Sequence, residues 1–283
     1  MTPATPEPHS ARYFALLYSP PSQRPVLDAL FGIEREVFES LRPGLDHHVA
    51  HSRLQWWREE CERAANRRAV HPLTKALVDA LKEPLATSPA SLTGLTGFVD
   101  VTVWDLAGAT FETRRELTAY CERWAAAMIE PLVAGATPLP SSLQSTNWRA
   151  LGAAMREIEL LANLAREAHY GRLRVPLDEL DTVKADPGSL AKTPLPEAVA
   201  NLLRVRHKSL RDEMVGVLGA LDPEQQPRLR GLLVWVALVW RSSLRAELAL
   251  PDGLRAGRFD AVADAWFAWR IARRATIGRF RLN

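Results

Sequence analysis

The sequence has few cysteines, which excludes a disulfide scaffold or a cysteine-based metal finger. Among 283 residues there are two, Cys61 and Cys121, and neither lies in a CxxC pattern or near a histidine at ligand spacing. Isolated thiols are typical of proteins kept in a reducing compartment. We therefore interpret both residues as reduced, half-buried side chains of helices in a cytoplasmic protein.

Long apolar runs are also missing. The longest, over residues 231–240, has about half the length needed to cross a bilayer. The first residues, MTPATPEPHSA, lack the apolar core of a secretion signal. We expect residues 1–11 to form a disordered leader and the rest to be soluble, with a peripheral membrane contact left open.

A large excess of one charge is absent as well. The formal net charge is +3 and the arginines are spread along the chain, so composition gives no support for a nucleic-acid partner. No convincing run alternates apolar and polar residues with period two, whereas 3.6-residue periodicity covers nearly every segment. With 47% hydrophobic residues, residues 12–283 are predicted to form one all-α helical domain.

Start and stop signals place the helices along the chain. Pro43 and Gly44 end a first helix, Asp46 caps a second, and His71 with Pro72 opens a third. Thr113 with Glu116 three residues later predicts a capping box. Residues 170–195 are predicted to be irregular. The expected helices cover residues 22–41, 46–67, from 71, 90–107, 113–134, 148–169, 196–221, 224–250 and 256–277.

Three patches of sequence together resemble a known family. They are RLQWWRE (53–59) with HPLTKAL (71–77), DVTVWD (100–105) with FETRRELTAYC (111–121), and NLARE (163–167) with GRLRVPLDEL (171–180). In this order and spacing they resemble the squalene/phytoene synthase family, the head-to-head isoprenyl diphosphate synthases, over about residues 12–275. The RLQWWR segment also resembles the branch that includes a mitochondrial assembly factor of respiratory complex I.

The resemblance implies a fold and a chemistry. The fold is the all-α isoprenoid synthase bundle around a deep apolar pocket, and active members condense two prenyl diphosphates. Carboxylates on facing helices hold Mg²⁺ there, which neutralises the leaving diphosphate. Arginines grip the diphosphate, and apolar side chains keep water from the carbocation.

The first metal motif of the family is altered in this chain. Aligned without a gap, Arg35 falls on a diphosphate-binding arginine, while the motif's aspartates fall on Phe38, Glu39 and Arg42. Two outer metal positions therefore carry an aromatic ring and a cation. Glu36 and Glu39 share one helical face and could serve as a replacement acidic motif, or they form an ordinary solvated face.

The second metal motif is altered too. Asn163 and Arg166 match the family pattern and Glu167 replaces its first aspartate. The second aspartate has no counterpart, because Gly171 and Arg172 arrive about one turn early. We interpret the chain as a family member that has lost or rebuilt its metal site.

Candidate site residues follow from the resemblance and the helical spacing. The metal candidates are Glu36, Glu39 and Glu167, and they imply Mg²⁺ only if the protein is catalytically active. The diphosphate-binding candidates are Arg35, Arg53, Asn163, Arg166 and Arg172. The pocket candidates are Phe38, Trp56, Trp57, Asp100, Asp105 and Trp240; because Trp56 and Trp57 are adjacent, at most one can face the centre.

Two further clusters have ordinary explanations. His47, His48 and His51 have the spacing of helical zinc ligands. No glutamate lies between them as in HExxH, and no third ligand is evident, so we interpret them as capping or surface residues. The last helix carries Trp266 and Trp269 among arginines. We expect it to pack on the bundle, with contact to a membrane or protein as the alternative.

Three functions stay open at this point. The leading hypothesis is a non-catalytic family member that binds a prenyl-like lipid or assists in the assembly of another protein. The alternative is a Mg²⁺-dependent prenyltransferase that uses isoprenoid diphosphates through a glutamate-based site. The third is a helical interaction scaffold with a collapsed pocket.

Overall fold

The computed structural model describes residues 6–81, 92–108, 110–136, 142–252 and 261–282. Within these ranges every regular element is a helix, which confirms the predicted all-α class. The elements are α1 (Ala11–Tyr18), α2 (Arg24–Phe38), η1 (Glu39–Leu41), α3 (His47–Ala65), α4 (Pro72–Ala80), α5 (Gly94–Leu106), α6 (Arg114–Met128), α7 (Glu130–Ala136), α8 (Ser142–Ala162), α9 (Leu164–His169), α10 (Leu177–Thr182), η4 (Pro187–Ala191), α11 (Glu197–Gly219), α12 (Gln226–Ala249) and α13 (Ala261–Thr276).

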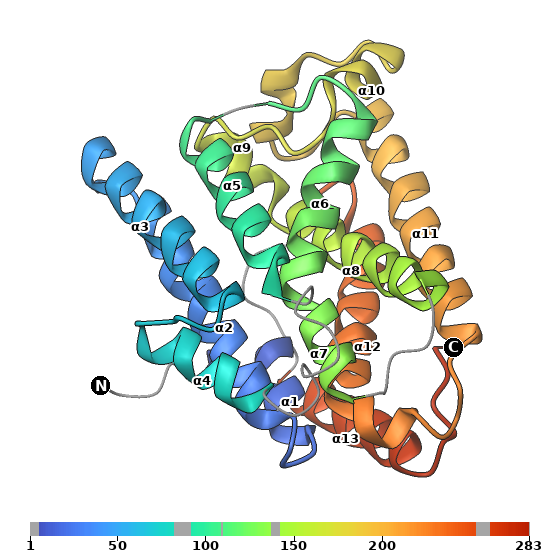
Figure 1. Ribbon diagram of the computed structural model, residues 1–283. Coiled ribbons are helices and arrows are strands. Elements are labelled where there is room, and N and C mark those ends of the chain that lie inside the picture. The colour runs from blue at the N-terminus through green and yellow to red at the C-terminus, as the bar shows by residue number, and fades with distance from the viewer. Residues whose placement is uncertain (1–5, 82–91, 109, 137–141, 253–260, 283) are drawn as a thin grey trace.

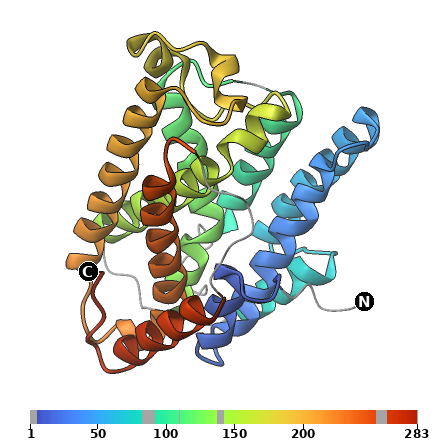
Figure 2. The ribbon, with the colours of Figure 1, turned by 180° about the vertical axis from the view of Figure 1, so that it is seen from behind.

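The core lies where α6, α8 and α12 meet. Figures 1 and 2 show α5 and α11 standing beside this core, α2 to α4 forming one flank, and α13 lying across the lower end. Trp124 of α6 and Trp235 of α12 are both fully buried, with ring centroids 5.8 Å apart. Phe31 of α2 packs edge-on against Trp235 at 5.1 Å, so the flank and the core share one apolar centre.

Several predicted helix starts are confirmed by their hydrogen bonds. The Asp46 carboxylate accepts from the backbone N–H groups of His48 and Val49, and the His71 ring accepts from the N–H of Leu73. Glu60, fully buried on α3, accepts from the N–H groups of Val70 and His71 at 2.8 Å. This carboxylate ties the start of α4 to α3.

The capping box at Thr113 is wrong in detail. The Thr113 side chain makes no capping bond, and Glu116 accepts instead from the N–H of Glu112 at 2.7 Å. The long helices expected over 113–134 and 148–169 are each divided in two, near Ile129 and Asn163. Such breaks leave no composition signal, because the flanking residues keep helical periodicity.

Short helices were missed because they depend on tertiary contact. α1 has eight residues, and α10 and η4 lie in the stretch expected to be irregular. α1 packs closely on α12 at Gly231, where an added Cβ would lie 2.7 Å from the carbonyl oxygen of Ala15. Residues 1–5, 90–91 and 256–260 of the predicted segments lie outside the described residues.

Both cysteines are free and fully buried rather than half-buried. Burial raises the pKa of the Cys61 thiol to about 12, and it raises the pKa of the Cys121 thiol as well. Both are therefore unreactive core side chains at neutral pH. Within the described residues, no helix is both long and apolar enough to cross a membrane.

Candidate functional site

The first motif ends in an exposed group of charges. Glu36 lies between two arginines, with its carboxylate oxygens 3.7 Å from a guanidinium nitrogen of Arg35 and 3.8 Å from one of Arg53. All three side chains are at least one third exposed, and Glu39 is exposed one turn later. We call Arg35, Glu36, Glu39 and Arg53 the α2 rim. Its ion pairs are long and solvated, so they are weak.

Glu34, two residues before Glu36, lies in the core instead. Its carboxylate accepts from Arg12 Nε and Nη2 at 2.8 and 3.0 Å, and from the indole N–H of Trp124 at 2.9 Å. The spacing of two residues turns the side chain by about 200° around the helix. Sequence analysis gave this residue no role, because its buried partners come from α1 and α6.

Arg12 links Glu34 to a second, partly buried acid. Its guanidinium lies 3.0 Å from Glu159 of α8. Burial alone would lower the pKa of Arg12, but the charges of Glu159 and Glu34 outweigh it and hold the pKa above its ordinary value. Arg12 is therefore a permanent cation between two carboxylates.

Arg156 of α8 occupies the middle of the bundle. Its guanidinium lies over the rings of Phe38, Trp124 and Tyr120, at 5.2, 5.6 and 5.9 Å from their centroids. It also donates to Glu159 at 3.4 Å and to the Tyr120 hydroxyl at 3.3 Å. Several aromatic faces around one cation form a cage, and here the protein's own side chain fills it.

Arg174 closes the second motif. Its two terminal nitrogens donate to Asp105 at 2.6 Å and to Glu167 at 2.9 Å. Asp105 also accepts from the Tyr120 hydroxyl at 2.7 Å, and Arg172 pairs with Glu167 at 3.6 Å. Arg174 is 2% exposed.

These contacts form one continuous path through the bundle, which we call the buried charge network. Its members come from six helices and from the segment after α9. Burial alone would lower the pKa of Arg174, yet Asp105 and its neighbours raise it above the ordinary value. The network consists of Arg12, Glu34, Glu159, Arg156, Tyr120, Asp105, Arg174 and Glu167.

The other candidate residues are scattered. Asp100 accepts from Arg58 at 3.0 Å on the surface, and Asn163 donates to the carbonyl of Glu159 at 2.9 Å. Arg166 is exposed and Trp240 is half-buried. The structure brings Asp105, Glu167 and Arg172 together but leaves these others apart from them.

The two adjacent tryptophans divide as expected. Trp57 is 3% exposed and Trp56 is 40% exposed. Both rings pack against His71, with centroids 4.9 and 5.8 Å away. The two rings therefore pack where α3 meets the start of α4.

The described side chains do not fit a magnesium ion. No group of three or more histidine, cysteine, aspartate or glutamate side chains within the described ranges is placed to hold a metal, and Glu36, Glu39 and Glu167 are among the residues covered. His47, His48 and His51 are exposed and form no such group either. Asp105 and Glu167 point their oxygens at Arg174, so a metal would have to displace an arginine.

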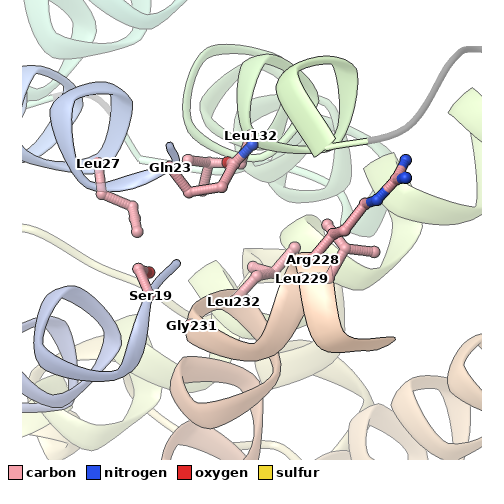
Figure 3. Close-up of a pocket in the computed structure, with 8 residues that line it drawn as sticks. All are labelled: Ser19, Gln23, Leu27, Leu132, Arg228, Leu229, Gly231 and Leu232. Atoms are coloured by element: carbon pink, nitrogen blue, oxygen red, sulfur yellow. The ribbon is translucent and has the colours of Figure 1, made fainter. Parts of the chain in front are cut away.

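A small pocket lies where the α1–α2 connection meets α7 and α12 (Figure 3). Its volume is about 10 Å³, roughly the room of one water molecule. None of the candidate site residues lines it. The lining residues are Ser19, Gln23, Leu27, Leu132, Arg228, Leu229, Gly231 and Leu232.

Comparison with known proteins agrees with this architecture. A sequence model of the squalene/phytoene synthase family matches residues 6–259. The chain therefore belongs to the squalene/phytoene synthase family. No curated protein matches it significantly in sequence.

Two solved structures share the fold. A dehydrosqualene synthase in complex with a ligand is similar with a TM-score of 0.74 and 15% identity, over 94% of this chain and 90% of that one. The squalene synthase HpnC from Alicyclobacillus acidocaldarius is similar with a TM-score of 0.68 and 17% identity, over 85% and 89% of the two chains. At this identity the similarity establishes the isoprenoid synthase fold.

Proposed function

We propose that this protein is a non-catalytic member of the family, which acts by binding a prenyl-like lipid or by assisting the assembly of another protein. One observation carries the proposal. Arg174 bridges Asp105 and Glu167, and the resemblance places Glu167 at the first aspartate of the second metal motif. The arginine supplies the positive charge that a metal would otherwise bring.

The bridge is costly to open. Arg174 is buried, and removing one partner of a buried ion pair costs about 3–5 kcal/mol because the other charge is left uncompensated. Mg²⁺ binds hard oxygen ligands and keeps part of its hydration shell. An ion entering here would have to move the guanidinium and bring water into the core.

Arg156 supports the same proposal. A carbocation intermediate needs aromatic faces and a dry cavity. In this protein Phe38, Tyr120 and Trp124 already surround a guanidinium. The cage is thus occupied by the protein's own cation, which argues against stabilisation of a substrate carbocation at these three rings.

The proposal is tested with purified protein, farnesyl or geranylgeranyl diphosphate and Mg²⁺. We expect neither released pyrophosphate nor a C30 or C40 hydrocarbon above the level of heat-denatured protein. The variant Arg174→Met, which removes the guanidinium from both carboxylates, is the control for metal binding by Asp105 and Glu167. Metal-dependent turnover by the wild type, lost in Glu167→Ala or Glu39→Ala, would overturn the proposal.

A second candidate function is a Mg²⁺-dependent prenyltransferase with its acidic site at the α2 rim. It is favoured by Glu36 and Glu39, which are partly exposed and exposed, respectively, on consecutive turns, and by the nearby cations Arg35 and Arg53. The two solved structures carry synthase names, dehydrosqualene synthase and squalene synthase. The same assay separates the candidates, since this one requires turnover that Glu36→Gln with Glu39→Gln abolishes.

A further inference from the structure

The outer face of α13 exposes large apolar side chains. Val262 is 80% exposed, Trp266 56%, Trp269 45% and Ile277, just beyond the helix end, 62%. Together with the exposed Arg273, these residues recur every three or four positions, so they lie along one side of the helix. We call Val262, Trp266, Trp269, Arg273 and Ile277 the α13 face.

The opposite side of α13 is firmly attached to the bundle. Asp264 is 1% exposed and accepts from Arg245 at 2.6 and 2.8 Å, while Arg241 of α12 lies 3.4 Å away. The helix cannot turn its aromatic face inward without breaking this pair. The side chains that pack inward are Phe267, Ala268, Ile271, Ala272 and Ala275.

Within residues 261–282, the exposed charged side chains are all arginines. Between residues 261 and 282 the sequence has one acidic residue, the buried Asp264, whereas Arg273, Arg274, Arg279 and Arg281 are exposed. Acidic side chains begin at the border, where Pro223, flanked by Asp222 and Glu224, lies against Gly278. The surface thus combines tryptophan, aliphatic residues and exposed arginine.

The arginines lie against the tryptophan rings. The Arg270 guanidinium lies 4.8 Å from the Trp266 ring centroid, and that of Arg273 lies 5.4 Å from the Trp269 centroid. Indole rings favour the boundary between lipid chains and headgroups. Guanidinium groups beside them can bind lipid phosphates while their stems cover apolar surface.

From these observations we propose that the α13 face is a docking surface for the headgroup region of an anionic lipid bilayer. The helix would lie in the plane of the membrane, with Trp266 and Trp269 inserted and the arginines at the phosphate level. Figures 1 and 2 show α13 along one edge of the molecule, with α12 rising from it. The bundle can therefore stand on a flat surface through this helix. The inference does not depend on the proposed function.

The test uses the full chain and sedimentation with lipid vesicles. We expect binding to phosphatidylcholine vesicles that contain about 30% phosphatidylglycerol, little binding to pure phosphatidylcholine, and release as salt rises. Trp266→Ser with Trp269→Ser should lower the partition coefficient about tenfold or more. Arg273→Gln with Arg274→Gln should lower it by a similar factor on anionic vesicles.

Matched controls separate the α13 face from the rest of the surface. Trp56→Ser removes an exposed tryptophan of α3, and Arg67→Gln with Arg68→Gln removes two exposed charges elsewhere; both should keep wild-type partitioning. Circular dichroism checks that every variant is folded. Equal partitioning of the α13 variants and controls would overturn the proposal, as would absent vesicle binding combined with self-association that needs Trp266 and Trp269.

Discussion

Glu34 and Glu36 lie two residues apart on one helix and have opposite surroundings. Glu34 is buried and accepts three hydrogen bonds from Arg12 and Trp124, whereas Glu36 is solvated between two arginines at 3.7 and 3.8 Å. The same contrast separates the whole buried charge network from the α2 rim. The contribution of a charged side chain to the stability of the fold therefore depends on the face of the helix on which it lies.

The contrast also changes how the family motifs are interpreted. Of the residues aligned with the first motif, Glu39 lies in the solvated α2 rim and Phe38 packs against Arg156. Asp105 and Glu167, by contrast, are bound by Arg174. In a catalytic site both groups would have to face a shared, open volume. Here Asp105 and Glu167 face Arg174 of the chain itself.

The largest expected effect comes from Arg174→Met. This variant leaves the buried Asp105 without its arginine and removes the closer of the two arginines that pair with Glu167. It should lose about 3–5 kcal/mol of unfolding free energy. Urea denaturation at neutral pH measures the change. Arg53→Met on the α2 rim is the matched control, with an expected loss below about 0.5 kcal/mol; similar losses in both variants would contradict the comparison.

A second prediction concerns pH and a neutral group buried on α11. Burial, reinforced by the charge of Arg211, lowers the pKa of His207 to about 4. Because the unfolded state takes up the proton first, stability should fall as pH drops from the ordinary value near 6.5 towards 4. The loss is about 3 kcal/mol over this window.

The variant His207→Gln isolates this effect from the protonation of carboxylates. Urea unfolding of wild type and variant at several pH values should show the wild type losing more stability on acidification. His51→Gln, at an exposed histidine of α3, should follow the wild type. Parallel pH profiles for wild type and His207→Gln would show that the buried imidazole is not responsible.

The third prediction tests the opening contrast directly. Glu34→Gln removes the charge that Arg12 and Trp124 bind, and should cost about 2 kcal/mol. Glu36→Gln should change the unfolding free energy by less than about 0.5 kcal/mol. Thermal and urea unfolding of the two variants measure these losses. A larger loss of stability in Glu36→Gln than in Glu34→Gln would contradict the conclusion that Glu34 is the structurally important charge.

The smallest expected effect is at the α2 rim. A double-mutant cycle of Glu36→Gln and Arg53→Met should give a coupling of about 0.2–0.5 kcal/mol at low salt. Salt screening should remove this coupling at about 0.5 M NaCl, because both side chains are solvated. A coupling that persists at high salt would show that the rim is more enclosed than its exposure indicates.

Much of the fold could be predicted from local signals. Asp46 and His71 begin helices where the sequence indicates, and the apolar periodicity of α11 and α12 locates both. The order of the motifs identified the family. The short α1 could not be predicted, because it depends on packing against α12. The break at Asn163 could not be predicted either, because the flanking residues keep helical periodicity.

The sequence by itself determined the helical class and the family, and it predicted the loss of two aspartate positions in the first motif. It could also show that Trp56 and Trp57 face different directions. Only the tertiary structure decided that Arg174 neutralises Asp105 and Glu167, that Arg156 fills an aromatic cage, and that the α13 face stays uncovered. The reason is physical: an ion pair between residues 69 positions apart, such as Asp105 and Arg174, leaves no periodic pattern, and burial depends on what the rest of the chain packs against.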